Sequence, residues 1–400
     1  MKPQDWQSLL QSDLSRRAES HLLRARRELV QLDSTHLEID GRRYVNFASN
    51  DYLGLTHHPR IIAAMQAALA SHGTGAGAAG LITGYTTSHA AAEKAIATWK
   101  GTEAAVLLPS GYQANHASVQ TIFAVAEQAG KSVRFLLDKL SHASLLDAVR
   151  GTGAPMRVFP HNHLAKLDRL LESADPSEIQ VVVTESIFSM DGDAADLRTL
   201  AAMKQRRNFL LLLDEAHGAG VYGPGGSGLA NELGLAGLAD VSIATLSKAA
   251  GIVGGAVCAS TAFCQALVNH GRAYIYSTAI PAAVAEGVVA SIGVMRDEPE
   301  RQARVRSLAA RVRSTLARRG LTLPAGDSPI IPVIVGSEEA ALSAAESLRA
   351  EGLLVIAVRP PTVPRGASRL RVTLSCEHSD EEVEKLIELL VKISGDSPPI

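Results

Sequence analysis

The sequence predicts an α/β protein whose large domain holds a mostly parallel, doubly wound sheet and whose smaller C-terminal domain is α+β. Short apolar runs alternate with helical patterns between residues 104 and 260, which is typical of a parallel sheet covered by helices. Several runs end in polar residues, and the carboxyl ends of parallel strands share the edge where ligands bind. Near Ile280–Pro281 the alternation stops. We expect an N-terminal helix and hairpin segment at 1–48, a large domain at 49–281 and a small domain at 282–400.

Composition limits the classes of protein that the chain could be. Its 400 residues carry a net charge of −2 and are 46% hydrophobic, which fits a globular protein and argues against a dedicated nucleic-acid binder. Three widely spaced cysteines are too few for a disulfide framework or a zinc site, so no metal is expected. No apolar segment precedes Arg16, and no run reaches about 20 apolar residues. We therefore expect a cytoplasmic protein without a signal peptide or membrane association.

The N-terminal region predicts a helix, a hairpin and a second helix. Residues 5–32 have an amphipathic helical pattern with a basic face. We interpret this face as exposed to solvent; the alternatives are a phosphate contact or a nucleic-acid-binding patch. Residues 35–47 predict a hairpin that turns at Asp40–Gly41, and a helix follows from Arg60 to His72. The glycines at 75, 77 and 80 have dinucleotide-motif spacing. That motif is rejected because it should follow a strand, and here it follows a helix.

The large domain is predicted from a series of strand-length apolar runs. A helix at 88–100 precedes the strand Ala104–Leu108, which enters the turn Ser110-Gly111-Tyr112. Glycine at a strand-to-helix turn leaves amides free for a phosphate, and Tyr112 could stack on a heterocycle, although an ordinary turn fits equally well. The remaining expected strands are Val133–Asp138, Met156–Phe159, Ile179–Glu185, Phe209–Leu213, Val241–Leu246 and Gly254–Ser260.

Polar side chains gather after these strands, and Lys248 is the most unusual of them. It follows an apolar strand and enters a run of small and apolar residues, where desolvation would lower the pKa of its amine and make it nucleophilic. Asp214 ends the preceding strand. A Schiff-base lysine with an upstream strand-end aspartate is the arrangement that pyridoxal phosphate needs. Spacing alone fits a structural pair of sheet-edge charges equally well. Further strand-end candidates are His142, Glu185, Ser189 and His217.

The C-terminal region predicts a small α+β domain with two arginines suited to carboxylates. A long arginine-rich helical segment at 282–319 precedes short strands at 330–335, 353–358 and 370–374, with a helix at 338–350. The last helix begins with the capping box Ser379-x-x-Glu382. Arg359 opens a proline-rich loop and Arg371 lies on the next strand. Since guanidinium groups bind carboxylates bidentately, both are candidate substrate anchors.

Seven stretches together resemble the α-oxoamine synthase family of pyridoxal-phosphate enzymes. They are SNDYLGLTHHP, LPSGYQAN, DKLSHASLLDA, VVTESIFSMDGD, LLDEAHGAGVYG, TLSKAAG and RPPTVPRGASRLRVTL. The resemblance runs from the N-terminal helix to Glu388. It implies the fold-type-I class of pyridoxal-phosphate transferases, with a mostly parallel seven-stranded sheet in the large domain.

The resemblance also implies roles for individual residues. Lys248 would bind pyridoxal 5'-phosphate covalently and later act as general base, Asp214 would hold the pyridine nitrogen, His217 the phenolic oxygen, and His142 would stack on the ring. Further cofactor contacts would come from Gly111, Tyr112, Glu185, Ser189, Thr245 and Thr278. The substrate would meet Arg24, Asn50, His142, Arg359, Thr362 and Arg371. Asn50 and Thr278 would reach across a homodimer interface that contains the active site.

Within the family, SNDYLGL with HHP and RPPTVP are similar to the biotin-pathway branch. That resemblance implies an acyltransferase that condenses L-alanine with pimeloyl-CoA or a pimeloyl-carrier protein, with loss of CO2 and the free thiol. Two departures from the family pattern are Leu81, where a polar residue is common, and Ala249-Ala250 after the lysine. The alternatives are a relative that uses glycine and acetyl-CoA, an aminotransferase, a catalytically silent cofactor-binding regulator, and a Ser247–Lys248 hydrolase. The last is disfavoured because adjacent residues in an extended chain point apart.

Overall fold

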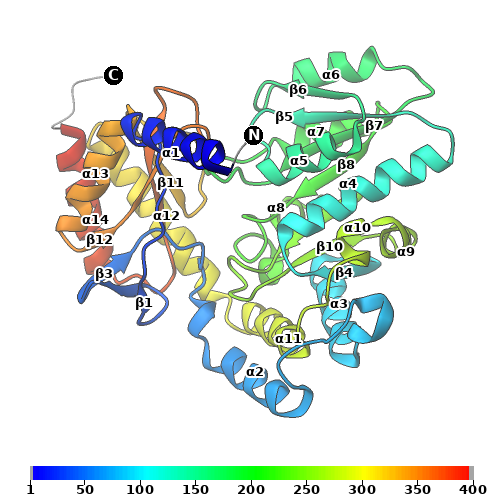
Figure 1. Cartoon of the computed structure of the whole chain (residues 1–400), viewed down its shortest axis with the longest axis horizontal. Coiled ribbons are helices and arrows are strands. Elements are labelled where there is room, and N and C mark those ends of the chain that lie inside the picture. The colour runs from blue at the N-terminus through cyan, green and yellow to red at the C-terminus, as the bar shows by residue number, and fades with distance from the viewer. Residues whose placement is uncertain (1–2, 396–400) are drawn as a thin grey trace. The chain divides into compact units, whose positions relative to one another are not determined.

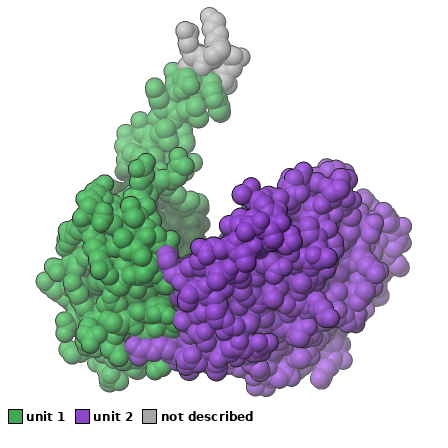
Figure 2. Space-filling view, turned by 90° about the horizontal axis from the view of Figure 1, so that it is seen from below, with its two compact units in different colours: residues 1–49, 190–192, 307–400 green, residues 50–189, 193–306 purple. Residues whose placement is uncertain are grey.

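The computed structural model describes residues 3–395 and divides into two compact units (Figure 2). Unit 1 comprises residues 1–49, 190–192 and 307–400, and unit 2 comprises residues 50–189 and 193–306. The N-terminal segment is therefore grouped with the C-terminal region. The stretch 282–306, which the sequence assigns to the small domain, is grouped with the large one.

Unit 2 is built on the predicted seven-stranded, mostly parallel sheet (Figure 1). Its strand order is β4-β10-β9-β8-β7-β5-β6, and only β10 runs antiparallel to its neighbours. The central strands are buried on both faces, which explains why their sequences are mostly apolar. Their bounds are β4 Ala104–Leu108, β5 Val133–Asp138, β6 Met156–Phe159, β7 Ile179–Glu185, β8 Leu210–Asp214, β9 Val241–Thr245 and β10 Gly255–Ala259.

Helices cover this sheet and fix the loops at its edge. Helix α4 packs against α5 and α9, whereas α11 packs against α2 and α3. The bounds of the longer ones are α2 Pro59–His72, α3 Thr87–Lys100, α4 Gly111–Gln128, α5 Ala143–Thr152, α6 Leu164–Glu172, α7 Leu197–Lys204, α9 Thr261–His270 and α11 Ala282–Asp297. The shorter ones are α8 Leu229–Glu232, α10 Arg272–Ile275, the 3₁₀ turns η1 Leu55–His57 and η3 Pro224–Gly226, and the π-helical turn η2 Gly80–Gly84.

Unit 1 contains two small sheets and three whole helices among its described residues, together with a fourth helix from residue 307 onward. The order β1-β2-β3-β12 gives one sheet and β11-β14-β13 the other. The predicted hairpin is confirmed, with β2 and β3 joined at Asp40–Gly41, both with positive φ. The bounds are β1 Val30–Gln31, β2 His36–Ile39, β3 Arg42–Asn46, β11 Ile330–Gly336, β12 Leu353–Leu354, β13 Ile356–Val358, β14 Ser368–Thr373, α1 Pro3–Glu19, α12 Glu300–Arg318, α13 Glu338–Ala350 and α14 Asp380–Gly395.

Three predicted elements differ from the structure. The helix expected at 5–32 ends at Glu19, and His21 takes a positive φ of 54° that a helix cannot accommodate. The helical segment expected at 282–319 is broken at Glu298–Pro299 into α11 and α12, because proline cannot donate the hydrogen bond that would continue the helix. The single strand expected at 353–358 is two strands in different sheets. Within residues 3–395, every helix is too short or too polar to cross a membrane.

Candidate active site

The candidate site lies where neighbouring parallel strands of unit 2 end. Asp214 is the last residue of β8, and Glu185, the last residue of β7, is paired with it across the ladder. Lys248 follows the end of β9, which lies on the other side of β8. The order of the strands therefore brings together side chains that are far apart in the sequence. Glu185 and Lys248, for example, are separated by 63 positions. This is the edge at which an open α/β sheet binds its ligand.

A line of hydrogen bonds connects the amine of Lys248 to the interior of unit 2. Its Nζ lies 2.9 Å from Nε2 of His217, and Nδ1 of His217 lies 2.6 Å from the hydroxyl of Tyr52. Tyr52 in turn donates to Oδ1 of Asn50 at 3.2 Å. One proton arrangement satisfies all three contacts: Lys248 donates to Nε2, and the imidazole donates through Nδ1 to the tyrosine oxygen. The predicted residues Lys248, His217 and Asn50 are thus joined through Tyr52, which the sequence did not single out.

A second network holds the carboxylate of Asp214. This carboxylate is buried and accepts hydrogen bonds from the side-chain amide of Asn115 at 2.8 Å and the backbone amide of Ala216 at 2.9 Å. The same amide of Asn115 donates to Oγ of Ser144 at 2.9 Å, and that oxygen lies 2.8 Å from Nδ1 of His142. Asn115 therefore fixes the aspartate and, through Ser144, the histidine.

His142 is held at the start of α5 with its ring in a fixed orientation. Its Nδ1 accepts a hydrogen bond from the amide of Ser144, which is the N-cap interaction of that helix. Burial lowers the pKa of His142; Asp214 opposes this effect and Lys248 adds to it. A neutral imidazole is a suitable surface for stacking on an aromatic ring.

Glu185 and Asp214 form a buried pair of carboxyl groups with unequal surroundings. Burial, followed by the charge of Asp214, raises the pKa of Glu185 well above its ordinary value, although Lys248 and the amide of His142 act against this. Among the described residues, no group hydrogen-bonds to Oε1 of Glu185. Asp214 has two donors on its oxygens, so we assign the negative charge to Asp214 and the proton to Glu185.

The N-terminus of α4 approaches the end of β9 closely. A Cβ on Gly111 would lie 2.3 Å from Oγ1 of Thr245, so only glycine fits at this turn. Ser110 caps the helix by accepting from the amide of Gln113, whereas the first amides of α4 have no intrahelical acceptor. Tyr112 is half exposed, and its hydroxyl donates to Asp147 at 3.2 Å. Ser189 is buried beyond β7, and Thr278 bridges to Ala79.

The residues at this edge fit pyridoxal phosphate. Lys248 supplies an amine for its aldehyde, and Asp214 supplies a buried carboxylate with acceptor positions left for a protonated ring nitrogen. His217 and the orphaned oxygen of Glu185 supply further polar atoms. The glycine turn at the start of α4 supplies amides of the kind that hold a phosphate.

A buried ion pair supports the turn that carries Asp214 and His217. Lys100, at the end of α3, donates to Oε2 of Glu215 and to the carbonyl of Ser227, and both charged side chains are only 2% exposed. The second carboxylate oxygen, Oε1, accepts from the amide of Ala230 at 3.2 Å. Glu215 thereby ties the turn after β8 to α3 and to the start of α8.

Replacing Lys100 by methionine is expected to cost about 3–5 kcal/mol of unfolding free energy, because Glu215 would remain buried without its counter-charge. A lower urea midpoint at an unchanged slope would report this loss. Lys94→Met, an exposed site on the same helix, is the control and should change stability by less than about 0.5 kcal/mol. The double variant Lys100→Met/Glu215→Met should recover most of the loss. If the double variant is less stable than Lys100→Met, the pair does not act as described.

Four of the six predicted substrate residues, Arg24, Arg359, Thr362 and Arg371, belong to unit 1. A guanidinium nitrogen of Arg24 donates to Oγ1 of Thr362 at 3.1 Å, although 338 residues separate them. Arg359 donates to the carbonyl of His21, and burial, with Arg24 adding to it, lowers its pKa. Arg371 is buried on β14. The predicted residues therefore fall into two sets, with this group in unit 1 and all the others in unit 2.

Sequence reasoning missed three polar residues at this site. Tyr52 and Asn115 lie inside motifs that the sequence singled out, and Asn115 follows Gly111 by one helical turn. Lys100 was assigned only to a helix end. A polar residue on the apolar face of a predicted helix was the available signal for Asn115. No local pattern distinguishes Lys100 from a solvated lysine.

Comparison with known proteins identifies the family of the chain. The family model for aminotransferase class I and II matches residues 42–390. The 8-amino-7-oxononanoate synthase of Stutzerimonas stutzeri is 42% identical over 385 residues, which cover 96% of each chain. The protein of that name from Cronobacter sakazakii is 41% identical over 386 residues, covering 96% of this chain and 98% of its own.

Solved structures show the same fold. A serine palmitoyltransferase from S. paucimobilis, with a bound PLP–myriocin aldimine, superposes with a TM-score of 0.90 at 28% identity over 99% of both chains. The 8-amino-7-oxononanoate synthase of Francisella tularensis superposes with a TM-score of 0.76 at 23% identity, covering 88% of this chain and 98% of its own, which bears on the fold alone. The chain therefore belongs to the class I and II aminotransferase family of pyridoxal-phosphate enzymes, in which it groups with the 8-amino-7-oxononanoate synthases.

Proposed function

We propose that the chain condenses L-alanine with a pimeloyl thioester, carried by coenzyme A or by a carrier protein, in biotin biosynthesis. The products are 8-amino-7-oxononanoate, CO2 and the free thiol. Sequence identity supports this substrate choice, because the curated relatives from Stutzerimonas stutzeri, Methylobacillus flagellatus and Cronobacter sakazakii that are named for that product are 38–42% identical.

The observation that carries the proposal is a hollow in unit 1 that two arginines help to line. The hollow has a volume of about 200 Å³ and an apolar wall formed by Leu22, Met190, Ile356, Ala357, Val358 and Pro360. Arg24, Arg359 and Thr362 also line it, and the two guanidinium groups are close enough for Arg24 to lower the pKa of Arg359. Two like charges beside an apolar wall suit a hydrocarbon chain that ends in a carboxylate. A pimeloyl group has that carboxylate, whereas acetyl and palmitoyl groups do not.

The residues of the sheet edge supply the proton transfers of this reaction. Bound pyridoxal phosphate supplies an electron sink that stabilises negative charge on the α-carbon of the amino acid. Asp214 holds the positive charge of the ring nitrogen, since its carboxylate is buried and fixed by Asn115. Lys248 removes the proton from the α-carbon as general base, and its amine is oriented by His217. Arg371 holds the carboxylate of the amino acid.

The proposed reaction forms one carbon–carbon bond and breaks two bonds, the C–S bond of the thioester and the bond between the α-carbon and the carboxylate of alanine. A carbon–carbon bond forms between the α-carbon of alanine and the acyl carbon, while the thioester C–S bond breaks and the thiolate leaves. The carboxylate of the alanine then leaves as CO2. A proton returns to the α-carbon, for which the amine of Lys248 is the nearby acid. One thioester and one alanine are consumed for each amino ketone formed.

We infer that the chain forms a homodimer whose interface includes the active site. Large apolar side chains are exposed on η2 and on the loop paired with it: Leu81, Ile82 and Tyr276, with Ile82 at 75% and Tyr276 at 73%. The bridge between Ala79 and Thr278 places these two segments side by side. An exposed apolar patch of this kind is typical of an interface. Asn50 and Thr278 are proposed to reach the site of the partner subunit across it.

We also place the protein in the cytoplasm. Cys258 and Cys264 are buried thiols that form no disulfide, which suits a reducing compartment.

A product assay tests the substrate choice. Purified, cofactor-loaded protein should form 8-amino-7-oxononanoate from L-alanine and pimeloyl-CoA, detected by mass spectrometry. Parallel reactions with glycine and acetyl-CoA, and with L-serine and palmitoyl-CoA, should give no more than about 1% of that rate, because their acyl groups lack the carboxylate that would meet Arg24 and Arg359. Product from either of these pairs alone would overturn the proposed substrates.

Arg24→Ala is the matched variant for the acyl hollow. It should lower kcat/KM for pimeloyl-CoA by about 10–100-fold, since one partner of the carboxylate would be lost. The KM for L-alanine and the affinity for the cofactor should stay within about twofold of the wild type. If kcat/KM for pimeloyl-CoA, the KM for L-alanine and the affinity for the cofactor all worsened by the same factor, Arg24 would support the fold and would not contact the acyl chain.

A further inference from the structure

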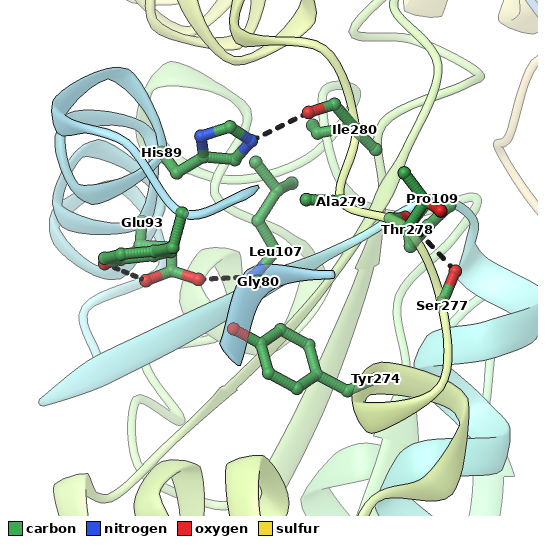
Figure 3. Close-up of a pocket in the computed structure, with 11 residues that line it drawn as sticks. Gly80, His89, Glu93, Leu107, Pro109, Tyr274, Ser277, Thr278, Ala279 and Ile280 are labelled. Carbon is green, nitrogen blue, oxygen red and sulfur yellow. Dashed lines mark hydrogen bonds between the residues drawn. The ribbon is translucent and has the colours of Figure 1, made fainter. Parts of the chain in front are cut away.

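Two polar residues of α3 take no part in the proposed reaction but face the loops beside the site. His89 and Glu93 are four residues apart and therefore lie on the same face of α3. Figure 3 shows both beside the segment Tyr274–Ile280, around a cavity of only about 20 Å³, roughly the space of one water molecule. We refer to His89 and Glu93 as the α3 clamp.

Glu93 joins the end of the η2 turn to the edge of the sheet. Its Oε1 accepts from the amide of Leu107 at 2.9 Å, and its Oε2 accepts from the hydroxyl of Tyr85 at 2.7 Å. Strand β4 is the outer strand of the seven, so the amide of Leu107 that faces outward needs a partner other than a strand. Burial raises the pKa of Glu93, against the effect of these two hydrogen bonds.

His89 fixes the segment that follows Thr278. Its Nδ1 accepts from the amide of Thr86 at 3.2 Å, so its Nε2 carries the proton and donates to the carbonyl of Ile280 at 2.8 Å. The ring is buried, at 4% exposure. The carbonyl it holds is two residues beyond Thr278.

The two segments that the clamp holds are joined to each other. Ala79 and Thr278 form a bridge, and the amide of Ala279 donates to the carbonyl of Ala78 at 3.0 Å. A Cβ on Gly84 would lie 2.2 Å from that carbonyl oxygen, so the packing depends on glycine. Movement at Tyr85 or Ile280 would therefore be transmitted to Thr278.

A further contact leads from this segment to the start of α4. The side-chain amide of Gln113 donates to Oγ of Ser277 at 3.3 Å. Gln113 lies in the first turn of α4, beside the proposed cofactor residues Gly111 and Tyr112. The same contacts therefore reach both Thr278 and the turn that is proposed to hold the phosphate.

We propose that Glu93 and His89 are positioning residues. They hold the segment that contains Thr278 in the position that this residue needs in order to contact the cofactor. This inference rests on the proposed role of Thr278 as a cofactor contact. Neither clamp residue contacts the reacting atoms. Loss of the clamp weakens the binding of pyridoxal phosphate, whereas substrate choice stays as it is.

The test compares Glu93→Ala with Glu93→Gln in the full-length protein, by titrating the cofactor-free form with pyridoxal phosphate and following fluorescence. Glu93→Ala should raise the Kd about tenfold, the effect of losing two buried hydrogen bonds. Glu93→Gln keeps an acceptor for Leu107 and a partner for Tyr85, so its Kd should stay within about twofold of the wild type. Lys94→Ala, the exposed neighbour, is the matched control and should leave the Kd unchanged.

Thermal unfolding separates positioning from a merely structural role. A positioning residue reduces the increase in Tm that the cofactor produces, because a higher Kd gives less stabilisation at a fixed concentration. An equal fall in the Tm of the cofactor-free and cofactor-bound forms, with an unchanged Kd, would overturn the inference. If Glu93→Ala fails to fold, Tyr85→Phe removes only one of the two links and should raise the Kd about threefold. An unchanged Kd in Tyr85→Phe would then overturn it.

A double-variant cycle tests whether the clamp acts through Thr278. Glu93→Ala should add less than about twofold to the Kd in a Thr278→Ala background, since the two changes would remove one interaction. Independent, multiplicative effects would overturn the proposed route. These titrations contain no substrate. If the product assay fails but the effects of Glu93→Ala and Thr278→Ala on the Kd are non-additive, only the proposed substrates are refuted. If the product forms but the two effects on the Kd are independent, only the role of the α3 clamp is refuted.

Discussion

Replacing Lys248 by alanine is expected to lower turnover by at least about 10⁴-fold while leaving the protein folded. The amine has two proposed uses, the covalent attachment of the cofactor and the proton transfer at the α-carbon. Lys100, a buried lysine of the same unit, cannot replace it because its amine is committed to Glu215. Turnover is measured as product formed from L-alanine and pimeloyl-CoA, and the visible absorption band of the lysine-bound cofactor should be absent.

The neighbouring exposed residue provides the control for this change. Ser247→Ala alters the adjacent position without removing the amine, and its turnover should stay within about threefold of the wild type. The variant of Lys248 should keep its circular dichroism spectrum, since the side chain is only partly buried. Turnover at the wild-type level in Lys248→Ala would eliminate this lysine as both attachment point and base.

Asp214→Asn is expected to lower turnover by about 10³-fold with a smaller effect on cofactor binding. Asparagine keeps the size of the side chain, and its single carbonyl oxygen can still accept from the amide of Ala216, so the local structure should persist although the hydrogen bond from Asn115 is lost. What is lost is the negative charge that keeps the ring nitrogen protonated and hence keeps the cofactor an effective electron sink. Single-turnover kinetics of α-proton removal, followed with deuterated L-alanine, would measure the loss directly.

The carboxyl group opposite Asp214 is the matched control. Glu185 is buried at the end of the adjacent strand and is assigned a proton, so Glu185→Gln changes little of the charge at the site. We expect a loss of less than about tenfold from Glu185→Gln. A loss from Glu185→Gln equal to that from Asp214→Asn would show that the charge had been assigned to the wrong carboxyl group.

The architecture of unit 2 could be predicted because buried parallel strands leave a strong local signal. Val241–Thr245 and Leu210–Asp214 are buried at almost every position, so the second is a continuous apolar run that ends in Asp214 and the first is apolar apart from Ser242 and Thr245. A glycine beyond a strand end, such as Gly111, marks a position where a side chain would meet a neighbouring strand, in this case at Thr245. Asp214, His217 and Lys248 could therefore be predicted as candidate site residues from their places after strands, without knowledge of their hydrogen-bond partners.

The partners of these side chains could not be predicted in the same way. Tyr52 contacts His217 over 165 positions and Lys100 contacts Glu215 over 115, and no local period specifies such pairings. Helix ends were also missed where a single residue overrides a continuing pattern, as at His21 and Pro299. Pro299 ends the helix because it lacks an amide donor, which is a signal in the sequence, whereas the end near His21 is visible only in the positive φ of that residue.

The most direct test of the site is to trap the cofactor on the protein with borohydride and to map the modified peptide by mass spectrometry. Reduction converts the bond between a lysine and pyridoxal phosphate into a stable secondary amine. The structure predicts a single phosphopyridoxyl group on the peptide containing Lys248, because this amine lies at the sheet edge beside His217 and Asp214. Modification of Lys139, which also follows a strand of the sheet, with Lys248 left unmodified, would contradict the account.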